Sequence, residues 1–293
     1  MLNIKPDGTY VDVTFGGGGH SRAILEQLSS DGRLLSFDRD IDAYANRIDD
    51  PRFTFVHSNF RYLENFLRYY EAGKADGILA DLGVSFHHFD SADRGFSFRS
   101  DAPLDMRMNQ NAPSTAAEIV AQYDEEKLKE MLKRYADLKS PGNVAKTIVK
   151  ARQKGEIATT FQLAETVRPA LDPRQEKKEM AQVFQALRIE TNDEMGDLRK
   201  FLEATTRVLK PGGRLAVLTY HSIEDRMVKN FMKTGNVQGD EKKDFFGKML
   251  SPWKLITRKP VEASDEEVES NPRSRSAKLR VAELVNPEMI ANE

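Results

Sequence analysis

The stretch VDVTFGGGGH, residues 11–20, decides the fold class of this chain of 293 residues. A short apolar run enters four consecutive glycines, and His20 opens a stretch that can form a helix. A strand that leads through a glycine-rich turn into a helix lets the backbone approach a ligand closely, because glycine has no side chain. The stretch therefore predicts an α/β fold with a ligand site after its first strand.

Short apolar runs and helical stretches alternate on both sides of the glycines, which is typical of strand–helix–strand units in a parallel sheet. The predicted strands are 10–15, 34–38, 53–57, 77–82, 214–220, 253–257 and 278–284. The predicted helices beside them are 21–28, 41–48, 62–70, 193–209 and 223–232. The two ends of the chain therefore contribute strands to one doubly wound sheet.

The alternation stops in the middle of the chain. Residues 116–135, 143–154 and 161–171 are amphipathic helical stretches with no strand between them. We therefore predict an inserted all-helical domain at 102–191, within a discontinuous core formed by 1–101 and 192–293.

Composition excludes several classes of site. The chain has no cysteine, and its five histidines lack a zinc-binding spacing, so we expect no metal. The longest apolar run, 215–218, is far shorter than the roughly 20 residues of a membrane-spanning helix. Lys5 and Pro6 lie where a signal peptide would need an apolar stretch, so we expect none. We expect a cytoplasmic protein with no membrane partner.

The net charge of −2 hides a basic segment. Residues 138–155 contain five basic side chains and no acidic one. Lys146, Lys150 and Lys154 are spaced by four, so on a helix they would form a stripe that could follow a phosphate backbone. The alternative is an ordinary solvated helix face. Segment 271–280 mixes basic and hydroxyl side chains, which suits phosphate oxygens or a charged strand edge.

Two carboxylates follow predicted strands. Asp38 lies about 20 residues after the glycines, where it can bind the hydroxyls of a ribose. Either a nicotinamide dinucleotide or S-adenosylmethionine fits this pattern, and the charge of Asp12 favours the cationic second cofactor. Asp81 ends the fourth strand, where it could accept a hydrogen bond from an exocyclic amine or merely cap the next turn.

The group His221, Ser222, Glu224 and Asp225 follows the fifth predicted strand and invites a hydrolase interpretation. We reject that interpretation, because a G-x-S-x-G elbow is missing. We expect Ser222 to be the N-cap of the next helix, with Asp225 at the capping-box position.

Eight segments together resemble the bacterial 16S ribosomal RNA (cytosine-N4) methyltransferase family. They are DVTFGGGGHS at 12–21, DRD at 38–40, DLGVS at 81–85, RGFSF at 94–98, PLDMRM at 103–108, FQALRI at 184–189, HSIEDR at 221–226 and the stretch 271–283. The resemblance covers nearly the whole chain. It implies a Rossmann-like S-adenosylmethionine-dependent methyltransferase core with an inserted all-helical domain.

The resemblance also implies a reaction and a site. Methyl transfer would go from S-adenosyl-L-methionine to the N4 amine of a cytidine, with Asp81 as the catalytic residue. The cofactor-binding positions are Gly18, Gly19, His20, Asp38, Phe60, Asp81 and His88, the last in place of the family's usual Gln. Taken with the basic segments described above, the expected RNA contacts are Arg107, Lys146, Lys150, Arg273 and Arg275. The expected partner is small-subunit ribosomal RNA or the assembled small ribosomal subunit.

Two other functions stay open at this point. A nicotinamide-dependent oxidoreductase would share the glycine loop and Asp38. A catalytically silent RNA-binding protein would fit the departures from the family at Phe86 and His88. The family usually has a further segment before the position of Met1 that reaches toward the active site, and we expect a chain without it to be less active.

Overall fold

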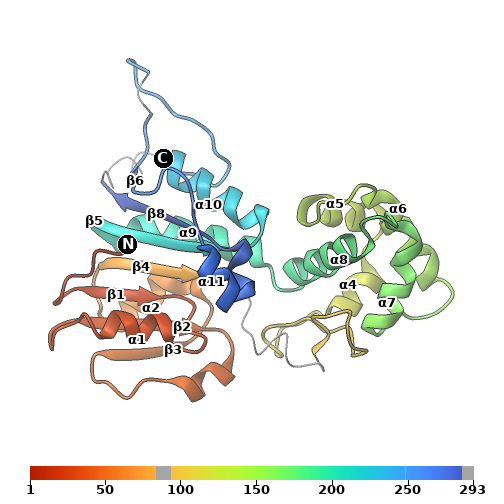
Figure 1. Cartoon of the computed structure of the whole chain (residues 1–293), viewed down its shortest axis with the longest axis horizontal. Helices are drawn as coiled ribbons and strands as arrows, with labels where there is room; N and C mark the ends of the chain where they lie inside the picture. The colour runs from red at the N-terminus through yellow and green to blue at the C-terminus, as the bar shows by residue number, and fades with distance from the viewer. Residues whose placement is uncertain (84–93, 248, 286–293) are drawn as a thin grey trace. The chain divides into compact units, whose positions relative to one another are not determined.

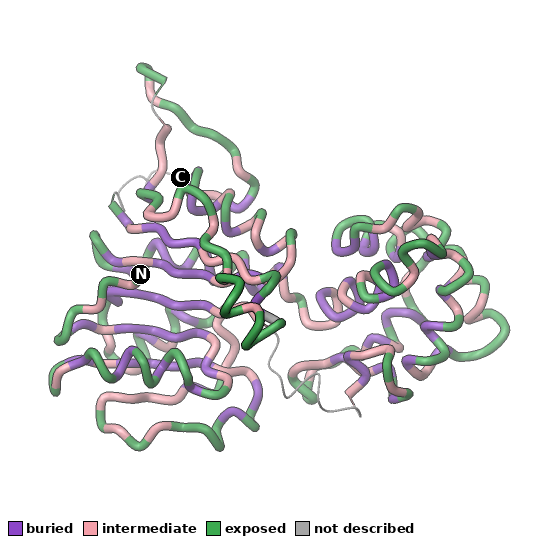
Figure 2. Tube along the Cα trace, viewed as in Figure 1, coloured by how far each residue is buried: buried purple, intermediate pink, exposed green. Residues whose placement is uncertain are grey.

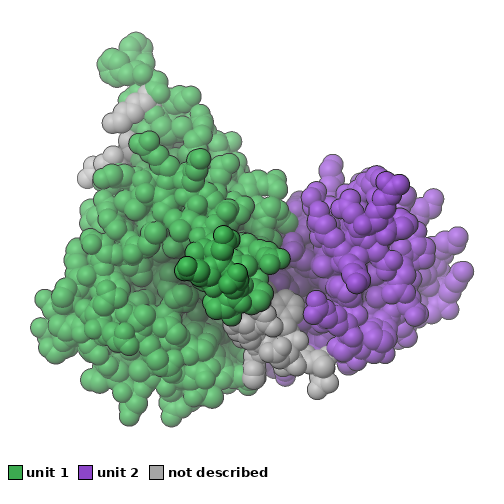
Figure 3. Space-filling view, viewed as in Figure 1, with its two compact units in different colours: residues 1–83, 195–293 green, residues 84–194 purple. Residues whose placement is uncertain are grey.

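The computed structural model describes residues 1–83, 94–247 and 249–285. Contacts divide the chain into two units, which Figure 3 shows in different colours. Unit 1 combines Met1–Gly83 with Met195–Glu293, and unit 2 is Val84–Glu194. The limits 102–191 predicted for the helical domain stay a prediction.

Unit 1 is built on an eight-stranded sheet in the order β3-β2-β1-β4-β5-β8-β6, with β7 paired to β8 (Figure 1). The strands are β1 (Thr9–Asp12), β2 (Arg33–Asp38), β3 (Phe53–His57), β4 (Ala75–Asp81), β5 (Leu209–Thr219), β6 (Trp253–Leu255), β7 (Val261–Glu262) and β8 (Lys278–Leu284). Strands β1 to β5 are parallel, and β8 is antiparallel to its neighbours. The α/β, Rossmann-like prediction is confirmed.

The order of the strands reverses between β1 and β4. From β1 the chain adds β2 and β3 on one side, and it then returns to add β4 and β5 on the other side. Ligands of open parallel sheets bind at the carboxyl ends of the strands beside such a reversal. The glycine loop follows β1 and Asp81 ends β4, so the two lie at that point.

Burial explains why these segments are strands. Strands of a parallel sheet are covered on both faces and therefore contain nearly continuous apolar runs. Leu34, Leu35, Phe37 and Ile78 are fully buried in β2 and β4, and Figure 2 shows buried residues along the strands. Pairing of Val11 with Leu35 and with Ile78 sets the register at the centre of the sheet.

The helical segments of unit 1 agree with the predicted ranges only in part. They are α1 (Gly19–Leu25), η1 (Ile41–Asn46), η2 (Phe60–Tyr62), α2 (Leu63–Tyr69), α9 (Glu194–Val208), α10 (Ser222–Thr234), α11 (Asp265–Ser270) and η5 (Pro272–Ser276), and α11 and η5 were not predicted. The predicted helix 41–48 is the 3-10 segment η1. The predicted turn 210–213 lies inside β5, as the irregular stretch between the pairs Ala75–Leu209 and Gly77–Arg214. The N-cap of α10 is His221, whose Nδ1 accepts from the Glu224 amide, so the Ser222 prediction is wrong.

Unit 2 is helical in the part that the structure describes. Its helices are α4 (Ala116–Gln122), α5 (Glu125–Tyr135), α6 (Pro141–Arg152), α7 (Thr160–Val167), η4 (Arg168–Ala170) and α8 (Glu176–Thr191). The predicted single helix 116–135 is two helices, because Asp124 caps α5 by accepting the Lys127 amide at 2.8 Å. Helix α6 ends at Arg152, so Lys154 lies in the turn that follows rather than on the helix.

Across the described residues, we find no helix with the length and apolar character that a membrane crossing requires.

Candidate active site

The loop after β1 and the end of β4 are joined by hydrogen bonds. The Val13 amide donates to the carbonyl of Leu79 at 2.9 Å, and the Asp81 amide donates to Oγ1 of Thr14 at 2.7 Å. These bonds continue the pairing of β1 with β4 beyond the last paired residues. The glycine loop and Asp81 are therefore fixed relative to each other.

The glycine loop has one crowded position and three open ones. Gly18 has a left-handed φ of 76°, and a Cβ there would lie 2.7 Å from Arg22 and 2.9 Å from the Phe15 ring. A Cβ at Gly16, Gly17 or Gly19 would meet no atom within 4 Å. Gly18 therefore allows the tight turn into α1, while the other three glycines leave open space beside the backbone where a ligand can approach.

Asp38 holds the loop through its carboxylate. Its Oδ2 accepts the Gly16 amide and its Oδ1 accepts the Asp40 amide, each at 2.8 Å. Burial raises the pKa of Asp38, and these two bonds oppose that rise. A carboxylate oxygen can accept two hydrogen bonds, so each oxygen keeps capacity for a ribose hydroxyl.

Asp81 is surrounded by donors. Its Oδ1 accepts the Gly83 amide at 3.0 Å, and its Oδ2 lies 3.4 Å from Nε2 of His20. Burial would raise the pKa of Asp81, but hydrogen bonds from His20, Gly83 and Tyr220 outweigh burial and lower it. The same contact raises the pKa of His20, against the effect of burial. Asp81 is therefore an anion near neutral pH, with 23% of its side chain exposed.

Tyr220 is the site residue that sequence reasoning missed. It follows β5, which is the neighbour of β4 in the sheet. A Cβ at Gly83 would lie 2.9 Å from the Tyr220 ring and 3.0 Å from Asp81, so a glycine is needed where the three meet. Burial and the charge of Asp81 raise the pKa of Tyr220, which keeps the phenol protonated. Only the order of the strands would have placed Tyr220 beside Asp81.

Asp12 is fully buried. Its Oδ2 accepts the Ser21 hydroxyl at 2.6 Å, and its Oδ1 accepts the Thr14 amide at 3.1 Å. Burial raises the pKa of Asp12, and the bonds from Ser21 and Thr14 oppose that rise. Asp12 ties α1 and the loop to β1.

Phe60 begins η2, after β3, and is partly exposed. Its ring lies 5.4 Å from that of Phe201, in an edge-on arrangement. The buried carboxylate of Asp197 pairs with Arg39 at 2.6 Å and with Arg61 at 2.9 Å, which orders the segments after β2 and β3. The Arg39 guanidinium lies over the Phe60 ring, 5.9 Å from its centroid, which leaves the opposite face to stack on adenine. His88 and Phe86 lie outside the described residues.

The predicted RNA contacts are distributed over both units. Arg107 forms a bidentate pair with Asp105 at 2.7 Å for both bonds and also donates to the Ala112 carbonyl, all within unit 2. Lys146 and Lys150 are exposed on α6, and neither forms an ion pair with a residue that the structure describes. Arg275 is exposed in η5. The structure does not describe the side chain of Arg273.

Comparisons with known proteins give a consistent result. A model of the MraW methylase family matches residues 1–285. The chain is 59% identical over 285 residues to ribosomal RNA small subunit methyltransferase H of Parabacteroides distasonis, covering 97% of this chain and 93% of that protein. Identity is 58% over 282 residues to the protein of the same name from Bacteroides fragilis, covering 96% and 93%.

Among solved structures, an rRNA methylase from Streptococcus thermophilus matches with a TM-score of 0.42 and 11% identity. That match covers 96% of this chain and 89% of the other.

Proposed function

This chain belongs to the MraW methylase family, and from that membership we propose that it transfers the methyl group of S-adenosylmethionine to the N4 amine of a cytidine in small-subunit ribosomal RNA. The observation that supports this chemistry best is the position of the Asp81 carboxylate, at the end of β4 beside the reversal of strand order. It is held there by Thr14, Gly83, His20 and Tyr220. A fixed acceptor at this point is what methyl transfer to an exocyclic amine needs.

The residues present fit the cofactor. Gly18, Gly19 and His20 lie where β1 turns into α1, Asp38 offers oxygens to a ribose, and Phe60 offers a ring face to adenine. We assign cofactor contacts to these residues and to Asp81, with His88 as the proposed substitute for the family's Gln. When bound, S-adenosylmethionine supplies an electrophilic methyl group on a sulfonium.

The amine must be prepared for attack. The lone pair of a cytosine amino group is delocalised into the ring, so the nitrogen is a poor nucleophile. A carboxylate that accepts one N–H turns the lone pair out of the ring and is aimed at the positive charge that develops there. Taking the methyl group, which the bound cofactor would release from its sulfur, would require the amine to give up one proton. Asp81 is placed to accept that proton and release it to solvent, because 23% of its side chain is exposed.

The basic residues provide the RNA side of the proposal. Lys146 and Lys150 carry uncompensated charge on α6, and Arg275 is exposed in η5. We assign these residues, together with Arg107 and Arg273, to RNA contacts. The pair of Arg107 with Asp105 leaves fewer N–H groups of its guanidinium for RNA. The proposed partner is small-subunit ribosomal RNA, free or in the assembled subunit, and we accordingly propose a cytoplasmic location.

The two other candidate functions gain no support from the comparisons. The matched family and the similar proteins are named as methylases and methyltransferases. A nicotinamide-dependent oxidoreductase and a silent RNA-binding protein both remain without an observation in their favour.

Methyl transfer to ribosomal particles tests the proposal. Small-subunit particles from cells lacking this enzyme are incubated with the protein and S-adenosylmethionine that carries a labelled methyl group. Nucleosides are then separated after complete digestion of the RNA. We expect the label in N4-methylated cytidine. Label on a base carbon or on a ribose would show that the amine is not the acceptor.

A further inference from the structure

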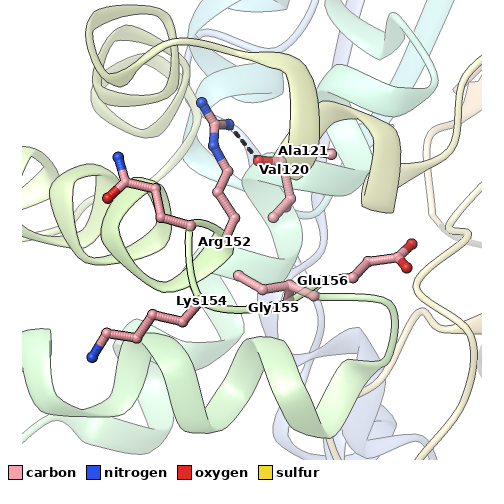
Figure 4. Close-up of a pocket in the computed structure, with 8 residues that line it drawn as sticks. Val120, Ala121, Arg152, Lys154, Gly155 and Glu156 are labelled. Atoms are coloured by element: carbon pink, nitrogen blue, oxygen red, sulfur yellow. Dashed lines mark hydrogen bonds between the residues drawn. The ribbon is translucent and has the colours of Figure 1, made fainter.

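Unit 2 contains a pocket of about 600 Å³ between the end of α4 and the loop that follows α6 (Figure 4). Val120 and Ala121 of α4 form one wall, Arg152 is the last residue of α6, and residues 153–157 form the loop. Val120 and Ile157 are buried apolar residues. The pocket therefore combines an apolar wall with a guanidinium.

Arg152 is held in place by backbone carbonyls. Its Nη1 donates to the carbonyl of Val120 at 2.7 Å and to that of Tyr123 at 2.6 Å. Carbonyls in the last turn of a helix have no partner within the helix, so Arg152 satisfies two of them at the end of α4. Figure 4 shows the bond to Val120. The guanidinium is consequently fixed before any ligand binds.

The other edge of this guanidinium is available. Within the described part of the chain, neither Nε nor Nη2 of Arg152 has an acceptor, and no carboxylate pairs with the side chain. This planar edge carries N–H groups that match two oxygens of a phosphate, and such charge-assisted pairs are among the strongest hydrogen bonds. A fixed, unpaired guanidinium is thus prepared for an anion.

The surroundings add positive charge. Lys154 lines the pocket, and Lys150 lies with Arg152 in the last turn of α6. Both lysines are exposed and form no ion pair with any described residue. Glu156 is the single carboxylate among the lining residues. In Figure 4 the side chains of Lys154 and Glu156 extend from opposite ends of the loop. The lining is therefore net positive.

We propose that this pocket binds a phosphate of the RNA backbone through the Nε–Nη2 edge of Arg152, with Lys154 and Lys150 adding charge and the apolar wall receiving the attached nucleoside. The inference rests on the proposed function, because it takes RNA as the substrate. It adds a specific phosphate site to what would otherwise be a diffuse basic surface.

Gly155 allows the cleanest test. It lines the pocket, its φ lies outside the left-handed region, and a Cβ there would meet no atom within 4 Å. Ala, Glu or Lys can therefore replace it without backbone strain. Changing Arg152 itself would also free the carbonyls of Val120 and Tyr123 and could unfold the end of α4.

The experiment titrates the full chain and its variants with a fluorescent fragment of small-subunit RNA at several salt concentrations. We expect Gly155→Glu to weaken binding about tenfold and to flatten the salt slope by about 0.7, the value for one lost contact with a single strand. Gly155→Lys should strengthen binding, and Gly155→Ala should leave it unchanged. Lys133 lies in the last turn of α5, outside the pocket lining. Lys133→Gln lowers the net charge by one unit, as Gly155→Glu does, and should change RNA affinity less than about twofold.

Equal weakening by Gly155→Glu and Lys133→Gln would overturn the proposal, because overall charge would then explain both. Thermal stabilisation of the wild type, but not of Gly155→Glu, by inorganic phosphate with no change in RNA affinity would overturn it too, in favour of a small-anion site. The test is separable from the proposed function. If the wild type methylates RNA but the Gly155 variants all bind RNA equally well, only the pocket proposal is rejected. If RNA affinity changes across the Gly155 variants as expected but the wild type transfers no methyl group, only the proposed function is rejected.

Discussion

The acids at the strand ends of unit 1 and the lysines of α6 in unit 2 differ in sign and also in how many neighbouring groups bind them. Asp12, Asp38 and Asp81 each accept at least two hydrogen bonds from neighbouring groups. Lys146 and Lys150 have no such partner among the described residues. Prearranged groups suit a small ligand of fixed shape, whereas unpaired cations suit a long, flexible polyanion.

This difference predicts two kinds of response to mutation. Changes at the strand ends should alter geometry, and therefore cofactor affinity or turnover, with little dependence on salt. Changes among the basic residues should alter the salt dependence of RNA binding and leave the cofactor unaffected.

The largest effect is expected for Asp81→Asn. The variant keeps the shape of the side chain but loses the charge and one acceptor for the amine. We expect single-turnover methyl transfer to slow by roughly 10²- to 10³-fold, the scale for removing one preorganised group that stabilises the transition state. Affinity for S-adenosylmethionine, measured by calorimetry, should fall much less. An equal fall in both would show that Asp81 serves the cofactor only.

Asp38→Ala should act on cofactor binding alone. Loss of hydrogen bonds to a charged group is expected to weaken S-adenosylmethionine binding by about 1.5 to 3 kcal/mol. The variant also frees the amides of Gly16 and Asp40, so Asp38→Asn, which keeps one acceptor, is the matched control and should lose less. Unchanged affinity in a folded Asp38→Ala variant would remove Asp38 from the site.

Replacing Lys146, Lys150 and Lys154 together by Gln tests the other region. If each contacts a phosphate of a single strand, the slope of log affinity against log salt should flatten by about 2. Gln keeps a helix propensity close to that of Lys, and affinity for S-adenosylmethionine should stay unchanged. An unaltered slope would return these lysines to an ordinary solvated surface and make segment 271–280 the leading RNA contact.

The smallest effect is expected for Tyr220→Phe. The phenol helps to lower the pKa of Asp81, so its removal should let that pKa rise. Activity that needs the ionised carboxylate is lost as pH falls through its pKa, so the acidic limb of the pH–rate profile should move to higher pH. Near neutral pH we expect turnover to fall only about fivefold, the scale of one hydrogen bond. An unmoved acidic limb would contradict the role of Tyr220 in lowering the pKa of Asp81.

The sequence predicted best where its signal is local. β3 and β8 occupy the predicted ranges 53–57 and 278–284, and Asp38 and Asp81 end strands as expected. Both strands have turn residues or charged flanks that set their limits. The order of strands then brings the glycine loop to Asp81.

Features that depend on tertiary contacts escaped prediction. Tyr220 reaches Asp81 only because β5 is the neighbour of β4. The burial of Asp12 depends on the packing of α1 against the sheet, which brings Ser21 to its carboxyl group. Helix α8 was missed because charged residues dominate its first turn, while its buried positions, from Met180 to Leu187, become clear only once α5 packs against it.

The most direct test of the division between chemistry and RNA binding is the affinity of Asp81→Asn for a small-subunit RNA fragment, measured by fluorescence anisotropy. Because the RNA contacts lie in the basic residues, we predict a Kd within about threefold of the wild type even though methyl transfer is nearly lost. A loss of RNA affinity as large as that of the triple lysine variant would contradict the division.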